Sequence, residues 1–422
     1  MKKSLFAIAA VTAFAGAAQA QSSVTVYGLL DYGYQGASQT QAGPTAVTKS
    51  QGSGIMGSGQ STSRLGFRGN EDLGGGMSAF FTAEVALNTD NSTTAGSATA
   101  QATTANAGQG LFGTGGASNR QTFIGLSKKG LGRASIGLQQ TPMHNAVAAT
   151  NAGGLNNQMG DVLYDRSGQA AVNNYTASGM GTNTSYTVRT TNALILTSEN
   201  LSGFQANVML VSRGSDATQT AANTGGQSSN TGMGVGINYT LKKLFVTANY
   251  QQFNQEQTQG IGAAVGAAPV FAPGYNGGTT TIGNNAKDTQ QYYAATYDFG
   301  IMKVFAGYIN RKVENNANSN NYVTRTAQQI GVTAPITPKV NVFASGGMGR
   351  INNTGTNGPT GDFTGWQLGS NYVLSKRTNL YAIYGASNTA NSTTGAYAAT
   401  ATGTANTSWN QSSYAVGMRH TF

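Results

Sequence analysis

The final stretch of the chain, Tyr414-Ala-Val-Gly-Met-Arg-His-Thr-Phe422, decides the fold. Large side chains occupy every second position and small or polar ones lie between them: Tyr414, Val416, Met418, His420 and Phe422 alternate with Ala415, Gly417, Arg419 and Thr421. Because side chains two residues apart in a β-strand share a face, this stretch predicts a strand with one oily face and one polar or small-residue face.

The same alternation recurs along the whole chain. Over 77–87, Phe81 and Val85 share one face and Thr82 and Glu84 share the other. Similar segments begin with 24–34 and 61–69 and end with 412–422. They predict an all-β chain of about sixteen strands.

The connectors between these predicted strands alternate strictly in length. Short ones such as 70–76, 129–131 and 241–243 separate long ones: 89–119, 141–185, 253–289 and 387–411. Transmembrane barrels have short periplasmic turns and long extracellular loops, and their closure pairs the backbone N–H and C=O groups that lipid cannot bind. The pattern therefore predicts a transmembrane antiparallel β-barrel.

The N-terminus predicts export. Met1-Lys2-Lys3 is basic, an Ala-rich apolar run follows, and Ala18-Gln19-Ala20 offers a small-residue cleavage site, as in a secretory signal peptide. We expect residues 1–20 to be removed and residues 21–422 to form one barrel domain. The chain has no Cys, so we expect no disulfide, metal-thiolate site or catalytic thiol.

Composition argues against several classes of protein. Charged residues make up only 9% of the chain, against about 25% in typical soluble domains. No later apolar run is long enough for a transmembrane helix, and the net charge of +10 is dispersed without a basic helix, so nucleic acid is not an expected partner. His144 and His420 lack obvious acid partners, so we expect no enzyme activity, metal site or cofactor.

Several segments together resemble the general porins of β-proteobacteria, the group that includes neisserial-type porins. The segments are 22–31, 63–80 with the pattern S-R-x-G-F-x-G-x-E-D-L-G-x-G, 119–126, 201–204 and 414–422. The resemblance implies an outer-membrane homotrimer in contact with lipid and lipopolysaccharide, with a third extracellular loop, here 141–185, folded inward as a constriction. One departure is that Leu138 follows Gly137, where relatives often carry Arg.

Strand phase nominates side chains for the pore wall. Arg64 and Arg68 lie opposite Leu65 and Phe67, and the same reasoning gives the set Arg64, Arg68, Arg120, Arg133, Arg189, Asp31 and Glu84. The constriction loop adds Asp161, Asp165 and Arg166. Wall arginines facing loop acids predict a transverse field, and their excess predicts a weak anion preference at low salt. Each arginine could instead contact lipopolysaccharide, form a loop salt bridge or snorkel to the interface.

The expected function is passive diffusion of small hydrophilic solutes and ions through a water-filled channel. Two alternatives stay open. A substrate-specific channel of the same fold would be indicated by inward aromatic residues among Tyr27, Phe245 and Tyr381, although Tyr27 also suits an interfacial aromatic girdle. A surface adhesin barrel would carry a passenger domain.

Overall fold

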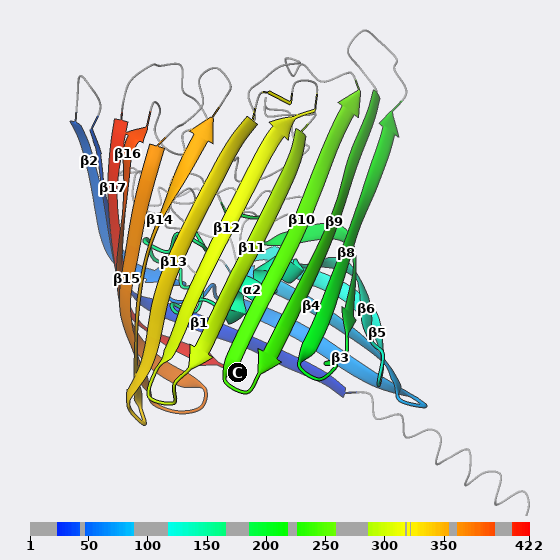
Figure 1. Ribbon diagram of the computed structural model, residues 1–422. Helices are drawn as coiled ribbons and strands as arrows, with labels where there is room; N and C mark the ends of the chain where they lie inside the picture. The colour runs from blue at the N-terminus through cyan, green and yellow to red at the C-terminus, as the bar shows by residue number, and fades with distance from the viewer. Residues whose placement is uncertain are drawn as a thin grey trace, which may run out of the picture.

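The computed structural model describes residues 23–42, 47–87, 117–165, 185–217, 226–258, 286–316, 319–320, 322–353, 361–392 and 407–422. Their strands form one antiparallel sheet that closes into a barrel around a short helix, α2 (Pro142–Ala149), as Figure 1 shows. No helix in this described part of the chain is both long and apolar enough to cross a membrane.

The strands follow one another around the barrel, and β1 pairs with β17 to close it. Their bounds are β1 Ser23–Ala42, β2 Val47–Gly57, β3 Arg64–Gly74, β4 Met77–Leu87, β5 Ala117–Lys128, β6 Gly132–Gln140, β7 Arg189–Ser198, β8 Phe204–Ala217, β9 Gly226–Leu241, β10 Leu244–Thr258, β11 Ala286–Asp298, β12 Lys303–Asn315, β13 Tyr322–Thr337, β14 Val340–Asn353, β15 Gly361–Val373, β16 Thr378–Ser392 and β17 Thr407–Thr421.

The second strand position of the barrel is shared by two strands. The half of β1 from Tyr32 to Ala42 pairs with β2, and the half from Ser23 to Leu29 pairs with β3. The fold is therefore a closed sixteen-strand antiparallel barrel with one extra strand, which confirms the predicted fold class.

The sequence prediction was wrong about the first connector. Residues 35–60 were expected to form a loop between strands over 24–34 and 61–69, but β1 continues to Ala42 and β2 occupies Val47–Gly57. This hairpin is rich in Gln, Ser, Thr and Gly. Between Tyr34 and Ile55 near its base and Val47 near its tip, its outward positions are polar or small, so alternation of hydrophobicity could not reveal the pairing.

The outer surface of the barrel is apolar. Outward side chains such as Val24, Ile124 and Ile330 are 67%, 64% and 69% exposed, and they alternate along their strands with inward positions. The C-terminus lies at the end where the strands are joined by short turns (Figure 1). This pattern of apolar outward faces is the one that a lipid-facing barrel requires.

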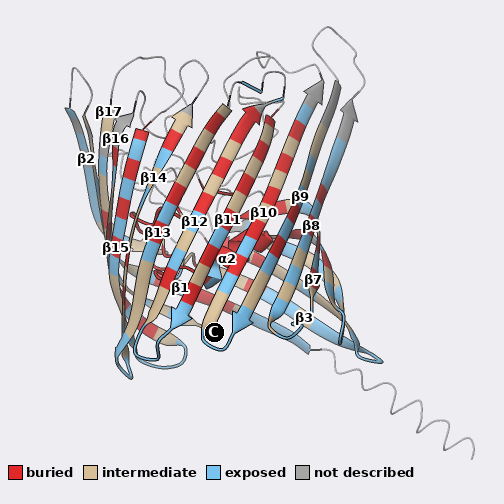
Figure 2. Ribbon diagram, in the orientation of Figure 1, coloured by how far each residue is buried: buried red, intermediate tan, exposed pale blue. Residues whose placement is uncertain are grey.

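The interior also contains an apolar core. Met143, Val147 and Leu163 pack with wall residues such as Ile309 and Phe363 in one buried cluster. Figure 2 shows buried residues recurring along β10 to β13 beside α2. The inward face of the wall is therefore not uniformly polar, because part of it packs against chain inside the barrel.

Candidate functional site

The connector between β6 and β7 folds into the barrel. Its described parts, 141–165 and 185–188, are named loop 3 here. The Thr141 hydroxyl caps α2 by accepting a hydrogen bond from the backbone N of His144 at 3.2 Å, and it donates to the carbonyl of Thr187 at 2.9 Å. Pro142 follows at the start of the helix, where its missing N–H is not required. The two described parts of loop 3 are thus joined where they leave the wall.

Hydrogen bonds fasten loop 3 to distant strands. The backbone N of Val162 donates to Gln329 Oε1 on β13 at 2.8 Å. Farther round the barrel, Asn156 Nδ2 donates to Gln367 Oε1 on β15 at 2.8 Å. Loop 3 therefore runs along the inner wall instead of projecting from the barrel.

Both described acids of loop 3 are buried against this wall. Asp165 forms an ion pair of 2.9 Å with Arg325 on β13. Asp161 accepts hydrogen bonds from the backbone N atoms of Leu163 and Tyr164 at 2.9 and 2.8 Å, while burial raises the pKa of its carboxyl above the usual value. Arg166 lies outside the described residues. Within the described residues, no cluster of three His, Asp or Glu side chains could hold a metal ion.

Inward glycines let loop 3 approach the wall closely. A Cβ at Gly385 would collide with the carbonyl oxygen of Met159, and a Cβ at Gly365 would lie 2.5 Å from the carbonyl oxygen of Gly160. A Cβ at three further glycines would meet side chains of loop 3: Gly307, Gly331 and Gly347. Because glycine lacks a Cβ, these residues form a trough in β12 to β16 that any larger residue would partly fill.

A second segment, 58–63, also lies on the inner wall. It interrupts the second strand position between β2 and β3 and is named the strand insert. The Asp31 carboxylate accepts hydrogen bonds from the backbone N atoms of Gln60 and Ser61 at 2.9 and 2.6 Å. Loop 3 reaches it through Gln158, whose Nε2 donates to the carbonyl of Gly59 at 2.8 Å. The insert therefore links the wall near β1 to loop 3.

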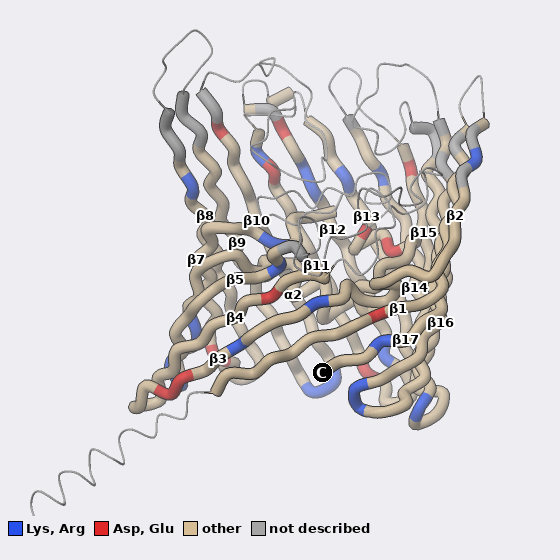
Figure 3. The backbone as a smooth tube through the Cα atoms, turned by 180° about the vertical axis from the view of Figure 1, so that it is seen from behind, with Lys and Arg blue, Asp and Glu red and all other residues tan. Residues whose placement is uncertain are grey.

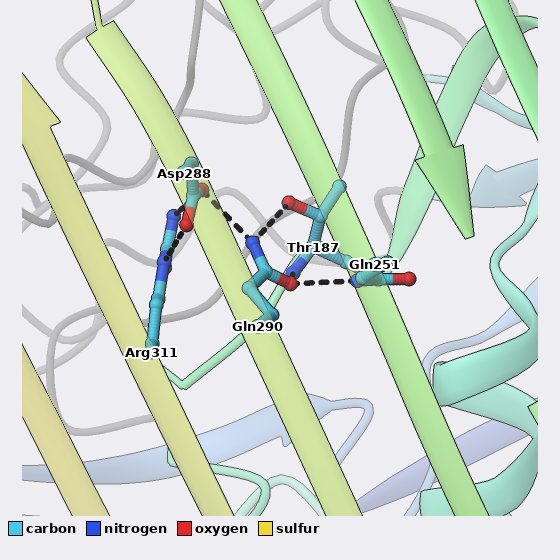
Figure 4. A network of polar contacts seen from close by, with 5 residues as sticks. All are labelled: Thr187, Gln251, Asp288, Gln290 and Arg311. Carbon is cyan, nitrogen blue, oxygen red and sulfur yellow. Dashed lines mark hydrogen bonds and ion pairs between the residues drawn. The ribbon is translucent and has the colours of Figure 1, made fainter. Parts of the chain in front are cut away.

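The end of loop 3 is held by a polar network on β10 to β12 (Figure 4). Thr187 N donates to Gln290 Oε1 at 2.8 Å, and Gln251 Nε2 donates to the same oxygen at 2.6 Å. Gln290 Nε2 donates to Asp288 at 2.8 Å, and Asp288 pairs with Arg311 at 2.7 Å. These charges neutralise one another on the wall.

An arginine cluster lies on the other side of the lumen, on β3, β5 and β7. Arg120 forms an ion pair of 2.7 Å with Glu84, and Arg64 lies 4.0 Å from the same carboxylate oxygen. Arg189 begins β7 beside loop 3. The cluster thus comprises Arg64 and Arg120, which share the carboxylate of Glu84, and Arg189, whose charge acts with theirs on His144 of α2.

Burial and the positive charge of this cluster lower the pKa of His144 on α2. Its side chain is 5% exposed, and its Nδ1 lies 2.9 Å from the Tyr186 hydroxyl. Burial, followed by the charges of Arg189, Arg120 and Arg64, holds the pKa of His144 well below its ordinary 6.5. The imidazole is therefore neutral near pH 7, and a proton there would oppose the arginines.

The remaining predicted wall residues lie nearer the short turns. Arg68 is exposed, with its guanidinium carbon 5.4 Å from the ring centre of Tyr27. Tyr27 donates a hydrogen bond of 3.2 Å to Glu84, so its assignment to an outer aromatic girdle was wrong. Arg133 is exposed and lies opposite Ser127 and Thr197 in a polar row.

The exposed edge of loop 3 carries no charge among the described residues. Its exposed positions are Asn145, Ala148, Ala149 and Gly154, and its half-buried positions are Leu155, Asn157, Met159 and Tyr164. The expected field between wall arginines and loop acids therefore changes: Asp161 and Asp165 face the wall, and the edge that remains accessible is neutral.

Sequence reasoning missed the ion pair of Asp288 and Arg311. Asp288 fell in the predicted loop 253–289, so no strand face was assigned to its side chain. Arg311 shares its face with Ile309 and Val313, which are buried inward. The available signal was the two-residue spacing of Asp288 and Gln290 on β11, beside Arg311 on the neighbouring strand β12.

Comparisons with known proteins agree over most of the chain. A family model described as Gram-negative porin matches residues 7–392. An outer membrane porin protein of Bordetella pertussis is 29% identical over 400 residues, covering 90% of this chain and 93% of that protein. An anion-selective porin from Comamonas acidovorans has a TM-score of 0.59 at 20% identity, covering 95% of this chain and 100% of that one. The trimer form of in-vitro folded OmpT, an outer membrane protein of Vibrio cholerae, has a TM-score of 0.50 at 14% identity, covering 93% and 99%.

Proposed function

Because the chain belongs to the Gram-negative porin family, we propose that this outer-membrane porin passes small hydrophilic solutes with a preference for anions. Porins act by passive diffusion through a water-filled lumen, so side chains on the inner wall decide which solutes pass. The proposed wall consists of Arg64, Arg68, Arg120, Arg133, Arg189, Asp31 and Glu84, with loop 3 as the constriction. No catalytic step is proposed.

One observation carries the anion preference. Arg64 and Arg120 share the single carboxylate of Glu84, while Asp161 and Asp165 are buried against the opposite wall. The positive charge near the constriction is thus only partly neutralised, and the loop edge that faces it carries no acid among the described residues. Anions are attracted to such a wall, and salt screens the attraction.

The inward aromatic residues favour general diffusion over a substrate-specific channel. Tyr27 and Tyr381 both face inward, but their hydroxyls are hydrogen-bonded to Glu84 and Asp31. Tyr381 is only 2% exposed. These rings are engaged with the wall and do not form an accessible row along which a sugar could stack.

The decisive experiment is a reversal-potential measurement on purified protein in a planar bilayer under a KCl gradient. We expect ohmic conductance, chloride preference near 0.1 M salt, and weaker preference near 1 M, where the Debye length falls from about 10 Å to about 3 Å. Potassium preference at low salt would refute the proposal. The trimer form of the similar Vibrio protein and the family resemblance support a homotrimer, which predicts conductance steps in groups of three.

The same proposal includes export of the protein and its contacts in the outer membrane. Residues 1–20 would direct export and be removed, and the folded trimer would contact outer-membrane lipid and lipopolysaccharide. Mass spectrometry of the mature N-terminus tests the first point: a chain that begins at Gln21 supports it, and one that retains Met1 contradicts it.

A further inference from the structure

The short turns on one side of the barrel carry a row of cations. Lys242 and Lys243 form the turn between β9 and β10, Lys339 lies in the turn between β13 and β14, and Lys376 and Arg377 precede β16. Lys303 begins β12. Figure 3 shows basic segments in turns at the end where the C-terminus lies. These six residues are named the basic arc.

Few acids accompany the basic arc. Asp298 lies on it, but its Oδ1 accepts a hydrogen bond from the backbone N of Gly300 at 2.7 Å, and the terminal carboxylate of Phe422 lies near Gly28. Among the described residues, no ion pair includes a cation of the arc. Lys303 Nζ lies 5.0 Å from the ring centre of the buried Phe305, so the positive charge available to an external partner is that of the other five cations.

The turns on the other side of the barrel are balanced. Lys128 and Lys129 lie there together with Glu71, Asp72 and Glu199. Lys128 Nζ donates to the carbonyl of Gly75 at 2.7 Å. Charge is thus distributed unevenly around the rim, and these two lysines provide a matched comparison with the arc.

Large apolar side chains are exposed beside the cations of the arc. Ile301 is 77% exposed, and Leu241 and Leu374 are each 50% exposed. Leu241 precedes Lys242 directly, and Leu374 lies two residues before Lys376. Apolar residues beside Lys and Arg are typical of segments at a lipid interface, where the apolar group enters the acyl boundary and the cation remains among headgroups.

We propose that the basic arc binds the phosphate headgroups of anionic phospholipids in the leaflet on the short-turn side of the membrane. Juxtamembrane Lys and Arg residues attract anionic headgroups, and the arc adjoins the oily outer face of the barrel. A soluble phosphate or a cell-wall polymer would gain nothing from the exposed Ile301 and Leu241. A lipid satisfies both the charged and the apolar groups.

The test compares lipid association with two matched double variants. Folded porin is reconstituted in phosphatidylcholine vesicles, and the motionally restricted fraction of spin-labelled phosphatidylglycerol is compared with that of spin-labelled phosphatidylcholine. We expect phosphatidylglycerol to be preferred by about fivefold. Lys376→Gln with Arg377→Gln should reduce this preference, and Lys128→Gln with Lys129→Gln should leave it unchanged. Heat-modified gel mobility verifies that each variant is folded.

Salt and cell-wall arms complete the test. Raising NaCl from about 0.1 M to about 1 M should reduce the preference, because screening shortens the range of the attraction. Equal association of the two lipids, or equal losses in both double variants, would overturn the proposal. So would co-sedimentation with purified peptidoglycan that depends on Lys376 and Arg377 while lipid association does not, since this would assign the arc to the cell wall.

Discussion

Tyr381 on β16 donates a hydrogen bond of 2.5 Å to the carboxylate of Asp31 on β1, across the intervening strand β17. The same carboxylate accepts two backbone N–H groups of the strand insert, 58–63. Asp31 thus joins β16 to a segment that loop 3 contacts through Gln158.

Removing this carboxylate should loosen the insert. In the wild type the backbone N–H groups of Gln60 and Ser61 and the Tyr381 hydroxyl donate to carboxylate oxygens of Asp31. Asp31→Asn removes the charge and replaces one of these oxygens by an NH2 group, which cannot accept. Hydrogen bonds to charged groups contribute about 1.5–3 kcal/mol each. We expect a lower midpoint of thermal unfolding in detergent and noisier single-channel currents. Tyr381→Phe removes only one of the three bonds and should have the smaller effect. A Tyr381→Phe effect equal to or larger than that of Asp31→Asn would show that Asp31 does not hold the insert.

The arginine cluster should respond in opposite directions to substitutions of opposite charge. Glu84→Gln removes the carboxylate that Arg64 and Arg120 share, so chloride preference should rise. Arg64→Gln should lower it. Arg350→Gln is the control, because Arg350 lies on the outer side of β14, paired with Asp362 at 3.7 Å. Reversal potentials at low salt measure all three, and a fall in chloride preference for Glu84→Gln would contradict the proposed wall.

The ion pair of Asp165 and Arg325 should matter for the position of loop 3. Arg325 is 0% exposed, and breaking a buried pair by removing one partner destabilises a protein by about 3–5 kcal/mol. We therefore expect Asp165→Asn to release part of loop 3, with larger current fluctuations and a lower unfolding midpoint. Combining it with Arg325→Gln should recover part of the loss, because no uncompensated charge remains. If the double variant recovers none of the lost stability, the unpaired charge of Arg325 is not the cause of the loss in Asp165→Asn.

Much of the fold could be predicted from the sequence, because lipid imposes a rule on one face of each strand. Outward apolar residues such as Val416 and Met418 alternate with small or polar ones, and this two-residue alternation predicted the strands of the barrel. The rule does not apply beyond the oily belt, so the pairing of Gln39 with Ser50 on β1 and β2 was missed.

The interior was harder to predict because its chemistry depends on tertiary contact. Strand phase placed Arg64 and Glu84 on one face, and the structure brings them together. Ile309 and Val313 also face inward, since they pack against loop 3, and no period distinguishes them from lipid-facing residues. The same contact buries Asp161 and Asp165, which the sequence alone could not orient.

The glycine trough predicts a specific effect on conductance. Gly385 faces the carbonyl oxygen of Met159 so closely that an added Cβ must displace loop 3 or the wall. Gly385→Ala should therefore move loop 3 toward the lumen and lower the single-channel conductance. Gly54→Ala is the control, because a Cβ at Gly54 would have no atom within 4 Å. An unchanged conductance in a folded Gly385→Ala protein would show that the trough does not set the loop position.

The buried His144 should make stability fall in acid. Its native pKa lies well below 6.5, whereas the unfolded side chain titrates near 6.5. Above that pH both states are neutral, and below it the unfolded chain alone takes up the proton, so the free energy of unfolding falls by about 1.4 kcal/mol per pH unit until the native pKa is reached. The unfolding midpoint between about pH 7.5 and about pH 5 should decline more steeply in the wild type than in His144→Gln. His420→Gln, at an exposed position on β17, should retain the wild-type slope. Parallel slopes for the wild type and His144→Gln would mean that other groups cause the acid sensitivity.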